Sequence, residues 1–412
     1  MKKPKQPSQV HRTILRQLVD LIPIHLVPKL ARQYGVDAQA RTFSPFSHVV
    51  ALLYVQLSHA LSLNDVCDAL RLMATPLRAL RGASAPSRNA LSHANKIRDW
   101  RMAEALFWQV LEQLQQRFPA FGGKGANPRP VWRFRRAIHV VDSTVIHLVA
   151  SCVDWANHNR RKAAAKCHLR LALRSLLPAV AVVDTAREND VQRMDAVCAG
   201  LQRGEIVLFD RGYHCLGHYA ALTRRGVFFV TRARENVTCR VLRRRADGGD
   251  PRILADEEVR LCGPRVRDDY PDALRRVTAR VLVDGEERVL TFITNNFTWS
   301  AGSVADLYRC RWQIEVFFKQ IKQTLQLADF LGHSANAVKW QIWMALLVYV
   351  LLRFQAWCGQ WPHSFSRLLT LLRTALWLPR DLGGLLESYG TAQGHFAQLE
   401  PPRQTWLPSF LV

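Results

Sequence analysis

Short apolar segments alternate with helical ones through the middle of the chain, and this alternation constrains the fold more than any other feature. Five segments have the composition of β-strands: AIHVVDSTVIHLV, KCHLRLALR, LPAVAVVDTA, EIVLFD and VFFVTRAR. Two segments with helical spacing, NDVQRMDAVCAGL and CLGHYAALTRRG, separate the later strands. A strand that is nearly all apolar is typical of a sheet covered on both faces. Three strands followed by alternating helices and strands therefore predict an α/β fold, with a mixed sheet flanked by helices.

The regions on either side of this core have a different pattern. Residues 12–118 carry apolar residues at helical spacing, with Ser62 as a cap position, and predict an all-helical N-terminal domain. Asp284-Gly285 stands between two alternating runs, which predicts a hairpin within a β-rich insertion. The predicted organisation is a helical domain at 1–120, a basic linker at 121–136, the first part of the core at 137–235, the insertion at 236–297, the rest of the core at 298–360, and a C-terminal helical region with a tail at 361–412.

The balance of charge favours a polyanionic partner. The 412 residues include 57 Lys and Arg against 33 Asp and Glu, which gives a formal charge of +24 at pH 7 and a pI near 10.4. Basic residues are spread along the whole chain, and an excess of this size is typical of proteins that bind nucleic acid. Ribosomal, membrane-surface and nucleoid proteins share this property, so charge alone names no function.

Cysteine usage and the apolar segments indicate the compartment. Nine cysteines are scattered without a Cys-x-x-Cys pair, which argues against a zinc site and against a secreted disulfide framework. The N-terminal segment MKKPKQPSQVHR is polar and basic, unlike a signal peptide. The apolar run from Trp340 to Phe354 is too short to span a bilayer and predicts a buried helix. We therefore expect a cytoplasmic protein with no membrane partner.

A polar helix is predicted in the segment PSRNALSHANKIRDW. Pro86 and Ser87 have the character of a helix start. The residues that follow make this helix polar and basic: Arg88, Asn89, His93, Asn95, Lys96 and Arg98. Such a helix can enter a DNA groove, and a merely solvated helix is an equally good interpretation.

Two carboxylates stand in or directly after apolar strands. Asp142 lies within HVVDSTV, where a charge is costly unless it is paired or bound to a metal. The alternative for Asp142 is a strand-end residue capped by Ser143 or Thr144. Asp210 ends the strand of IVLFDRGYH, at the carboxyl edge of the sheet where α/β sites form. Asp184 in VAVVDTA has the same local character but lacks the Arg-Gly-Tyr continuation, so we rank it below Asp210.

The segment YRCRWQIEVFFKQIK predicts one helix with two different faces. Four apolar residues are spaced for burial on one face: Ile314, Phe317, Ile321 and Leu325. A second stripe, roughly 80° wide at about 100° per residue, places one carboxylate among three cations and a phenol: Tyr308, Arg311, Glu315, Lys319 and Lys322. A solvated face with i,i+4 ion pairs is the alternative interpretation.

Three of these motifs together resemble the DDE transposases of the insertion-sequence family four, whose catalytic core is ribonuclease-H-like. The signature Tyr-x2-Arg-x3-Glu-x6-Lys of that family is matched without a gap by Tyr308, Arg311, Glu315 and Lys322. The DST strand and the DRGY turn match the first and second acidic islands of the family. The resemblance covers roughly residues 12–355 and also implies a β-rich insertion between the second Asp and the Glu.

The resemblance implies a mechanism and roles for the matched residues. Asp142, Asp210 and Glu315 would bind two Mg²⁺ ions, with Mn²⁺ as a substitute. Basic and aromatic residues would bind DNA phosphates near the cleaved strand: Tyr308, Arg311 and Lys322, with Lys319 as a helper. The expected reaction is cut-and-paste transposition by a homodimer. Its partners would be double-stranded DNA of the terminal repeats and of the target, at the bacterial nucleoid.

Other functions remain open at this point. A DNA-binding remnant that has lost catalysis and a metal-dependent nuclease that cleaves without joining are both compatible with the sequence. Some members of the family use a Trp of the insertion to handle a flipped base. Trp299 lies after the hairpin and too close to the signature helix, so we do not give it that role. Lys166 and His168 are predicted to be structural residues at the sheet edge.

Overall fold

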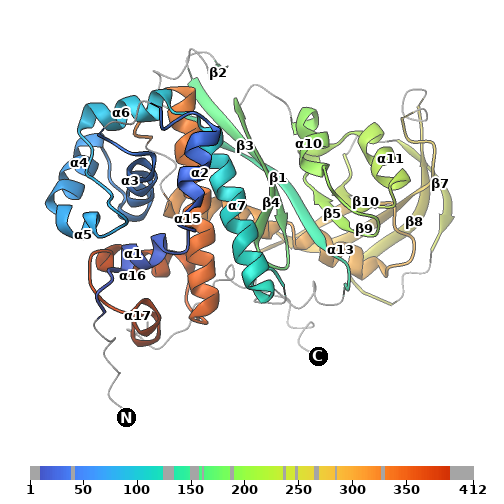
Figure 1. The fold of residues 1–412 in the computed structure, drawn as a ribbon. Coiled ribbons are helices and arrows are strands. Elements are labelled where there is room, and N and C mark those ends of the chain that lie inside the picture. Colours follow the sequence, from blue (N-terminus) through green and yellow to red (C-terminus); the bar gives the residue numbers. More distant parts are fainter. Residues whose placement is uncertain are drawn as a thin grey trace, which may run out of the picture. The chain divides into compact units, whose positions relative to one another are not determined.

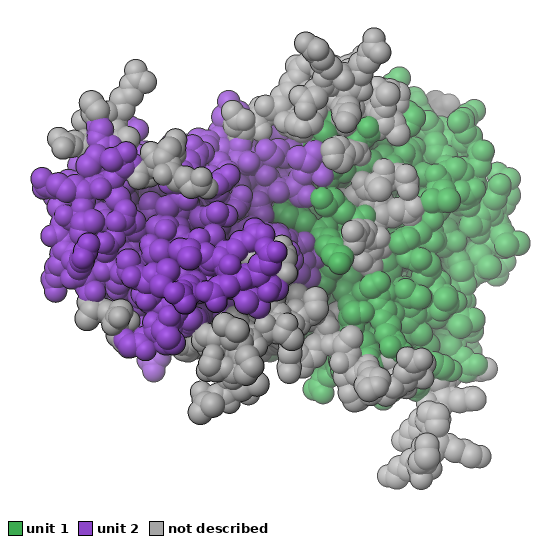
Figure 2. Space-filling model, turned by 180° about the vertical axis from the view of Figure 1, so that it is seen from behind, with its two compact units in different colours: residues 1–123, 146–165, 318–399 green, residues 124–145, 166–317, 400–412 purple. Residues whose placement is uncertain are grey.

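The chain forms two compact units in a computed structural model, and each is described by itself (Figure 2). Unit 1 comprises residues 1–123, 146–165 and 318–399, and unit 2 comprises residues 124–145, 166–317 and 400–412. The structure describes residues 10–38, 42–123, 134–148, 157–159, 162–185, 190–234, 238–245, 249–263, 269–283, 285–325 and 330–389. Most of the predicted basic linker, Asp284 and the tail after residue 389 therefore lie outside the described residues.

Unit 1 is built mainly from helices (Figure 1). In the N-terminal part these are α1 (Ile14–Val19), α2 (Leu26–Gln33), α3 (Pro45–Ser58), α4 (Leu63–Leu72), α5 (Ala74–Arg78), α6 (Arg88–Ile97), α7 (Arg101–Arg117) and the 3₁₀ turn η1 (Pro119–Gly122). The later helices are α15 (Ala335–Cys358), α16 (Phe365–Ala375) and α17 (Leu382–Ser388), and a short strand β2 (Asn157–Asn159) also falls in this unit. Ser62 caps α4 in a capping box with Asp65, and Ser87 caps α6, so both predicted helix starts are confirmed.

Helix α15 forms the centre of unit 1 and packs against α3, α6 and α7 (Figure 1). The helix extends beyond the apolar run Trp340–Phe354 on both sides, so the expectation that it is too short to span a bilayer was wrong: by length and composition it could cross a membrane. However, 83% of its most apolar window is buried within the structure. Helices α3 and α4 pass the same test as a pair, bent by 105°. The predicted buried helix at Trp340–Phe354 is therefore confirmed as a core element, because Trp340, Trp343 and Phe354 are 0, 1 and 3% exposed.

A buried histidine in α3 makes unit 1 sensitive to acid. His48 is fully buried, with Nε2 2.8 Å from Oδ1 of Asn95, and burial lowers its pKa to about 3. The unfolded chain takes up the proton near pH 6.5, so His48 contributes fully above that pH and its contribution is lost as pH falls towards 3. We expect His48→Gln to destabilise the protein less at pH 5 than at pH 7.5, by about 2 kcal/mol in the free energy of unfolding. Urea denaturation at both pH values measures this difference, and an equal loss at the two pH values would contradict it.

Unit 2 is organised around the predicted mixed sheet (Figure 1). The first strands are β1 (Ile138–Leu148), β3 (Lys162–Ala172), β4 (Leu177–Thr185), β5 (Ile206–Phe209) and β6 (Phe228–Arg232). The strand order is β3-β1-β5-β6-β10-β9-β8-β7, with β4 also paired to β3. Strand β1 is parallel to β5, and β5 is parallel to β6. The prediction of a mixed sheet with flanking helices is confirmed.

Helices and turns connect these strands and enclose the core of unit 2. They are η3 (Asp190–Arg193), α10 (Met194–Cys198), η4 (Arg211–Tyr213), α11 (Leu216–Arg224), α13 (Ala301–Arg309) and α14 (Trp312–Lys319), the last reaching into unit 1. Tyr219 of α11 stacks on Phe229 of β6 with ring centroids 4.6 Å apart, and both rings are about 99% or more buried. Apolar residues of β5 and β6 thus lie in the core of unit 2, and Asp210 directly follows β5.

The predicted insertion continues the same sheet. Its strands are β7 (Cys239–Arg244), β8 (Ile253–Leu261), β9 (Leu274–Val283) and β10 (Glu286–Thr294), paired antiparallel in sequence order. Gly285 has φ +85° in the turn between β9 and β10, which confirms the hairpin. Strand β10 also pairs with β6, so the insertion is joined to the core through backbone hydrogen bonds.

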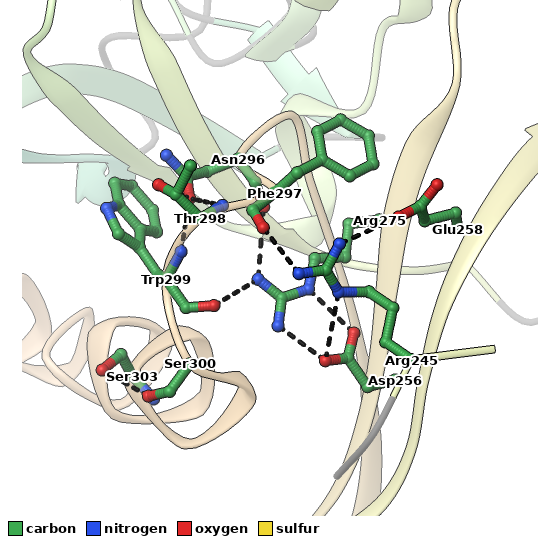
Figure 3. A network of polar contacts seen from close by, with 10 residues as sticks. All are labelled: Arg245, Asp256, Glu258, Arg275, Asn296, Phe297, Thr298, Trp299, Ser300 and Ser303. Atoms are coloured by element: carbon green, nitrogen blue, oxygen red, sulfur yellow. Dashed lines mark hydrogen bonds and ion pairs between the residues drawn. The ribbon is translucent and has the colours of Figure 1, made fainter. Parts of the chain in front are cut away.

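Two arginines that are ion-paired within the insertion also donate hydrogen bonds to the segment that precedes α13 (Figure 3). Arg275 of β9 is 1% exposed and donates to both carboxylate oxygens of Asp256, at 2.8 and 2.7 Å. Its Nη1 also donates to the carbonyl oxygen of Trp299, and Nη2 of Arg245 donates to that of Phe297. Since α13 begins at Ala301, the insertion holds the start of the helical segment that leads to Arg311.

Candidate active site

The first two acidic residues lie at the same level of neighbouring strands, Asp142 within β1 and Asp210 directly after β5. Val141 of β1 and Phe209 of β5 are paired in parallel register. Asp142 and Asp210 are the next residues of the two segments, so the register places both carboxylates together. The side chain of Asp142 is 16% exposed and that of Asp210 is 40% exposed.

The signature segment is not the single helix that its sequence predicts. Helix α13 ends at Arg309, and α14 begins at Trp312. Between them Arg311 N–H donates to the carbonyl oxygen of Tyr308, three residues back, which tightens the chain into a turn. After Lys319 the chain widens into a π-helical turn, η5 (Gln320–Thr324). The prediction of one continuous stripe from Tyr308 to Lys322 was therefore wrong, although the predicted apolar face is confirmed, because Ile314, Phe317, Ile321 and Leu325 are at most 3% exposed.

The guanidinium of Arg311 contacts all three predicted carboxylates. Its Nη1 lies 3.2 Å from Oδ2 of Asp142 and 3.9 Å from Oδ1 of Asp210. Its Nη2 lies 2.5 Å from Oε1 of Glu315, one turn along α14. Residues separated by more than 170 positions in the sequence therefore converge on one cation within unit 2.

Burial and Arg311 have the largest effects on the pKa of Asp142. Burial raises the pKa of Asp142 to about 7, and Asp210 and Glu315 add to this effect. Arg311 and the Ser143 N–H, which donates to Oδ1 of Asp142 at 2.7 Å, act in the opposite direction. Three carboxylates thus share the guanidinium of Arg311, and burial holds the pKa of Asp142 above its usual range.

Tyr308 supports Arg311 from the end of α13. The centroid of its ring lies 5.7 Å from Cζ of Arg311 and 4.8 Å from the ring of Phe292. Burial raises the pKa of Tyr308, so its hydroxyl stays protonated. Burial opposes the charge on Arg311, but the three carboxylates raise its pKa, so the guanidinium stays charged.

Lys319 and Lys322 fall in unit 1. Lys319 is the last residue of α14 and is exposed, whereas Lys322 lies in η5 and is half-buried. Their role in binding DNA stays a prediction.

The chemistry of the three carboxylates fits Mg²⁺, because hard cations prefer oxygen ligands. Among the described residues, however, no group of three metal-ligating side chains is arranged to hold an ion as it stands. The carboxylates contact the guanidinium of Arg311 instead, so a cation already lies where their oxygens meet. Asp142, Asp210 and Glu315 are the residues that would hold metal ions.

Two other residues weighed in the sequence have structural partners. Asp184 is ion-paired with Nε of Arg193 at 2.7 Å, which agrees with its lower rank. The ring of Trp299 makes T-shaped contacts with Phe134 and Phe228, with centroids 5.4 Å away in both cases.

One residue of this region was missed from the sequence. Asp190, at the start of η3, accepts a hydrogen bond from the hydroxyl of Ser143 and is ion-paired with Lys166. The alternation along β3 places Lys166 and His168 on one face, which was a local signal for this cluster. No local pattern in the sequence pointed to Asp190.

Comparison with known proteins identifies the family. Residues 133–351 match the family described as the transposase DDE domain, more than half of the chain. The chain belongs to the DDE transposases. Residues 10–80 also match a domain of unknown function.

Three relatives bear out the predicted insertion-sequence type. A putative transposase, y4zB, of Sinorhizobium fredii is 32% identical over 255 residues, which is 61% of this chain and 70% of the relative. A probable transposase of insertion sequence IS5377 from Geobacillus stearothermophilus is 27% identical, over 54% of this chain and 57% of the relative. The transposase InsG of insertion sequence IS4 from Escherichia coli is 26% identical, over 48% and 46%. The chain thus spans about half the length of the latter two transposases.

A solved structure of piggyBac transposase in a synaptic complex with hairpin DNA aligns with a TM-score of 0.44 at 9% identity, over 90% of this chain and 82% of that one.

Proposed function

We propose that this DDE transposase catalyses cut-and-paste transposition of an insertion sequence, by two-metal hydrolysis at the transposon ends followed by strand transfer into target DNA. The observation that carries the proposal is the convergence of Asp142, Asp210 and Glu315 on Arg311. When bound to such carboxylates, divalent ions supply activation of the attacking oxygen and charge stabilisation at the leaving oxygen.

The residues of this chain have distinct tasks in the proposed reaction. Asp142 and Asp210, fixed on paired parallel strands, and Glu315 on α14 would hold the ions. Arg311, with the ring of Tyr308 packed against its guanidinium, would bind the phosphate of the cleaved strand when the carboxylates bind metal ions. Lys319 and Lys322 would add positive charge along the backbone of the DNA. The excess of basic residues suits a protein that binds both transposon ends and target DNA, as a homodimer in the DNA complex at the bacterial nucleoid.

The products formed by the wild-type protein test the proposal. The probe is DNA that carries the terminal repeats flanking the gene, incubated with Mg²⁺ and a supercoiled target plasmid. We expect cleavage at the repeat boundary and joining of the freed 3′ end to the plasmid, resolved on a sequencing gel. Cleavage without joined product would favour a nuclease, and binding without cleavage would favour a catalytically dead remnant.

We infer that α6 contributes to recognition of the transposon end in the N-terminal region. Its exposed residues include Arg88, Asn89, His93 and Lys96, side chains that bind phosphates and base edges. Asn95 is buried and bonded to His48, so it is not available to DNA as the sequence suggested.

A charge-removal pair on α6 tests this role. We expect Arg88→Ala with Lys96→Ala to weaken binding to the terminal repeat about tenfold and to reduce the salt dependence by about two phosphate contacts. Fluorescence anisotropy at several salt concentrations measures both quantities. The matched control removes one Lys and one Arg from the exposed side of α2, Lys29→Ala with Arg32→Ala. If both double variants lost the same DNA affinity, α6 would contribute only general positive charge and no specific recognition of the transposon end.

A further inference from the structure

A second polar cluster lies beside the three carboxylates in unit 2, around Asp190. Oδ1 of Asp190 accepts a hydrogen bond from Oγ of Ser143 at 2.5 Å and lies 2.9 Å from Nζ of Lys166. His168 is fully buried, with Nδ1 3.5 Å from the same oxygen and 3.0 Å from the hydroxyl of Tyr213. Side chains from β1, β3 and η4 therefore meet around one carboxylate that the proposed reaction does not use.

The cluster is joined to the first acidic residue through Ser143. The backbone N–H of Ser143 donates to Oδ1 of Asp142 at 2.7 Å, while its hydroxyl donates to Asp190. One residue thus contacts both carboxylates. Because Asp190 fixes the Ser143 hydroxyl, it also limits the movement of the backbone that orients Asp142.

The cluster is joined to the second acidic residue through the turn η4. The N–H of Tyr213 donates to the carbonyl oxygen of Asp210 at 3.1 Å. A Cβ atom on Gly212 would lie 3.0 Å from Oδ2 of Asp190 and 3.9 Å from Oδ2 of Asp210. Asp190 therefore packs directly against the turn that carries Asp210, and glycine is the residue that permits this approach.

Lys166 compensates the charge of Asp190. A fourth carboxylate near Asp142 and Asp210 would add repulsion if it were not paired, and Lys166 supplies the opposite charge. The side chain of Lys166 is 12% exposed and that of Asp190 is 22% exposed, so water screens this pair only partly. Burial lowers the pKa of His168 to about 4, which leaves its imidazole neutral as a hydrogen-bonding partner of Tyr213.

We propose that Asp190 is a positioning residue of the transposase reaction, which fixes Asp142 and Asp210 relative to each other through Ser143 and the η4 turn. Lys166, His168 and Tyr213 hold it in place. This inference rests on the proposed function, because it assigns Asp190 no contact with DNA and gives it an effect only through the carboxylates that hold the metal ions.

The test compares Asp190→Ala and Asp190→Asn with the wild type, using Asp195→Ala as control, since the side chain of Asp195 on the adjacent α10 is 88% exposed. The first measurement is Mn²⁺ binding to the DNA-free protein by electron paramagnetic resonance, and the second is single-turnover cleavage of terminal-repeat DNA. We expect Asp190→Ala to weaken Mn²⁺ binding and to slow cleavage, each about 10- to 100-fold. Asp190→Asn should recover most of both, because its amide oxygen still accepts from Ser143 and Lys166.

The outcomes separate positioning from a structural role. A lower melting temperature with unchanged Mn²⁺ affinity of the folded protein would overturn the inference, and so would equal behaviour of Asp190→Ala and the control. A wild type that binds Mn²⁺ but does not cleave would overturn the proposed function, while the Mn²⁺ comparison would still decide the role of Asp190. A wild type that binds no Mn²⁺ would overturn both.

Discussion

Glu315→Gln is expected to abolish Mg²⁺-dependent cleavage of terminal-repeat DNA, with a loss of about 10³-fold or more in the single-turnover rate. Glutamine keeps the shape of the side chain but removes the charge needed to hold a divalent ion. Binding of DNA should stay within about twofold of the wild type, because phosphate contacts come from basic residues. Mn²⁺ should not restore cleavage, because the variant lacks a metal ligand and exchanging one divalent ion for another does not replace it.

The control for this change is Glu286→Gln in β10, whose side chain is 73% exposed and pairs with Arg288. It removes the same charge from the same unit, so it should leave cleavage unchanged. If Glu315→Gln cleaved at the wild-type rate, Glu315 would be one half of an ordinary helical ion pair with Arg311. The solvated-face interpretation of the signature segment would then be correct.

The two acidic strands could be predicted because their signals are local. Asp142 stands within an apolar strand and Asp210 directly after one, and the parallel register of the two strands brings the residues together. The hairpin turn was equally local, since a Gly with positive φ is what a two-residue turn requires. The pairing of β10 with β6 was not predictable in this way, because it joins distant segments through backbone atoms that carry no sequence signal.

The break between α13 and α14 shows the limit of helical periodicity. No Gly or Pro marks the segment from Tyr308 to Trp312, and its apolar spacing continues across the turn. Tertiary ion pairs act on both sides of the break: Arg252 on Asp306 at 2.8 Å, and Arg311 on the carboxylates of the sheet. Asp190 was missed for a related reason, because its role depends on partners from three separate elements.

Arg311→Gln is the second change with a large expected effect. Arg311 is 16% exposed in its side chain and contacts three carboxylates, so its removal leaves negative charges facing one another. Removing one partner of such a buried arrangement typically costs about 3 kcal/mol, and we expect a loss of that size in the free energy of unfolding without metal. Added Mg²⁺ should then raise the melting temperature of the variant more than that of the wild type, because the ion binds carboxylates that no guanidinium occupies.

Arg309→Gln is the matched control for this test. Arg309 lies two residues earlier and pairs with Asp306 at 3.6 Å, outside the carboxylate cluster. Its replacement should leave the response of the melting temperature to Mg²⁺ as in the wild type. Thermal melts of the three proteins over a range of Mg²⁺ concentrations give the comparison. An identical Mg²⁺ response in Arg311→Gln and the wild type would mean that the guanidinium and the ion do not share the same carboxylates. The structure would then show an ion-pair network next to the metal site, and Arg311 would have to reach DNA without first giving up those contacts.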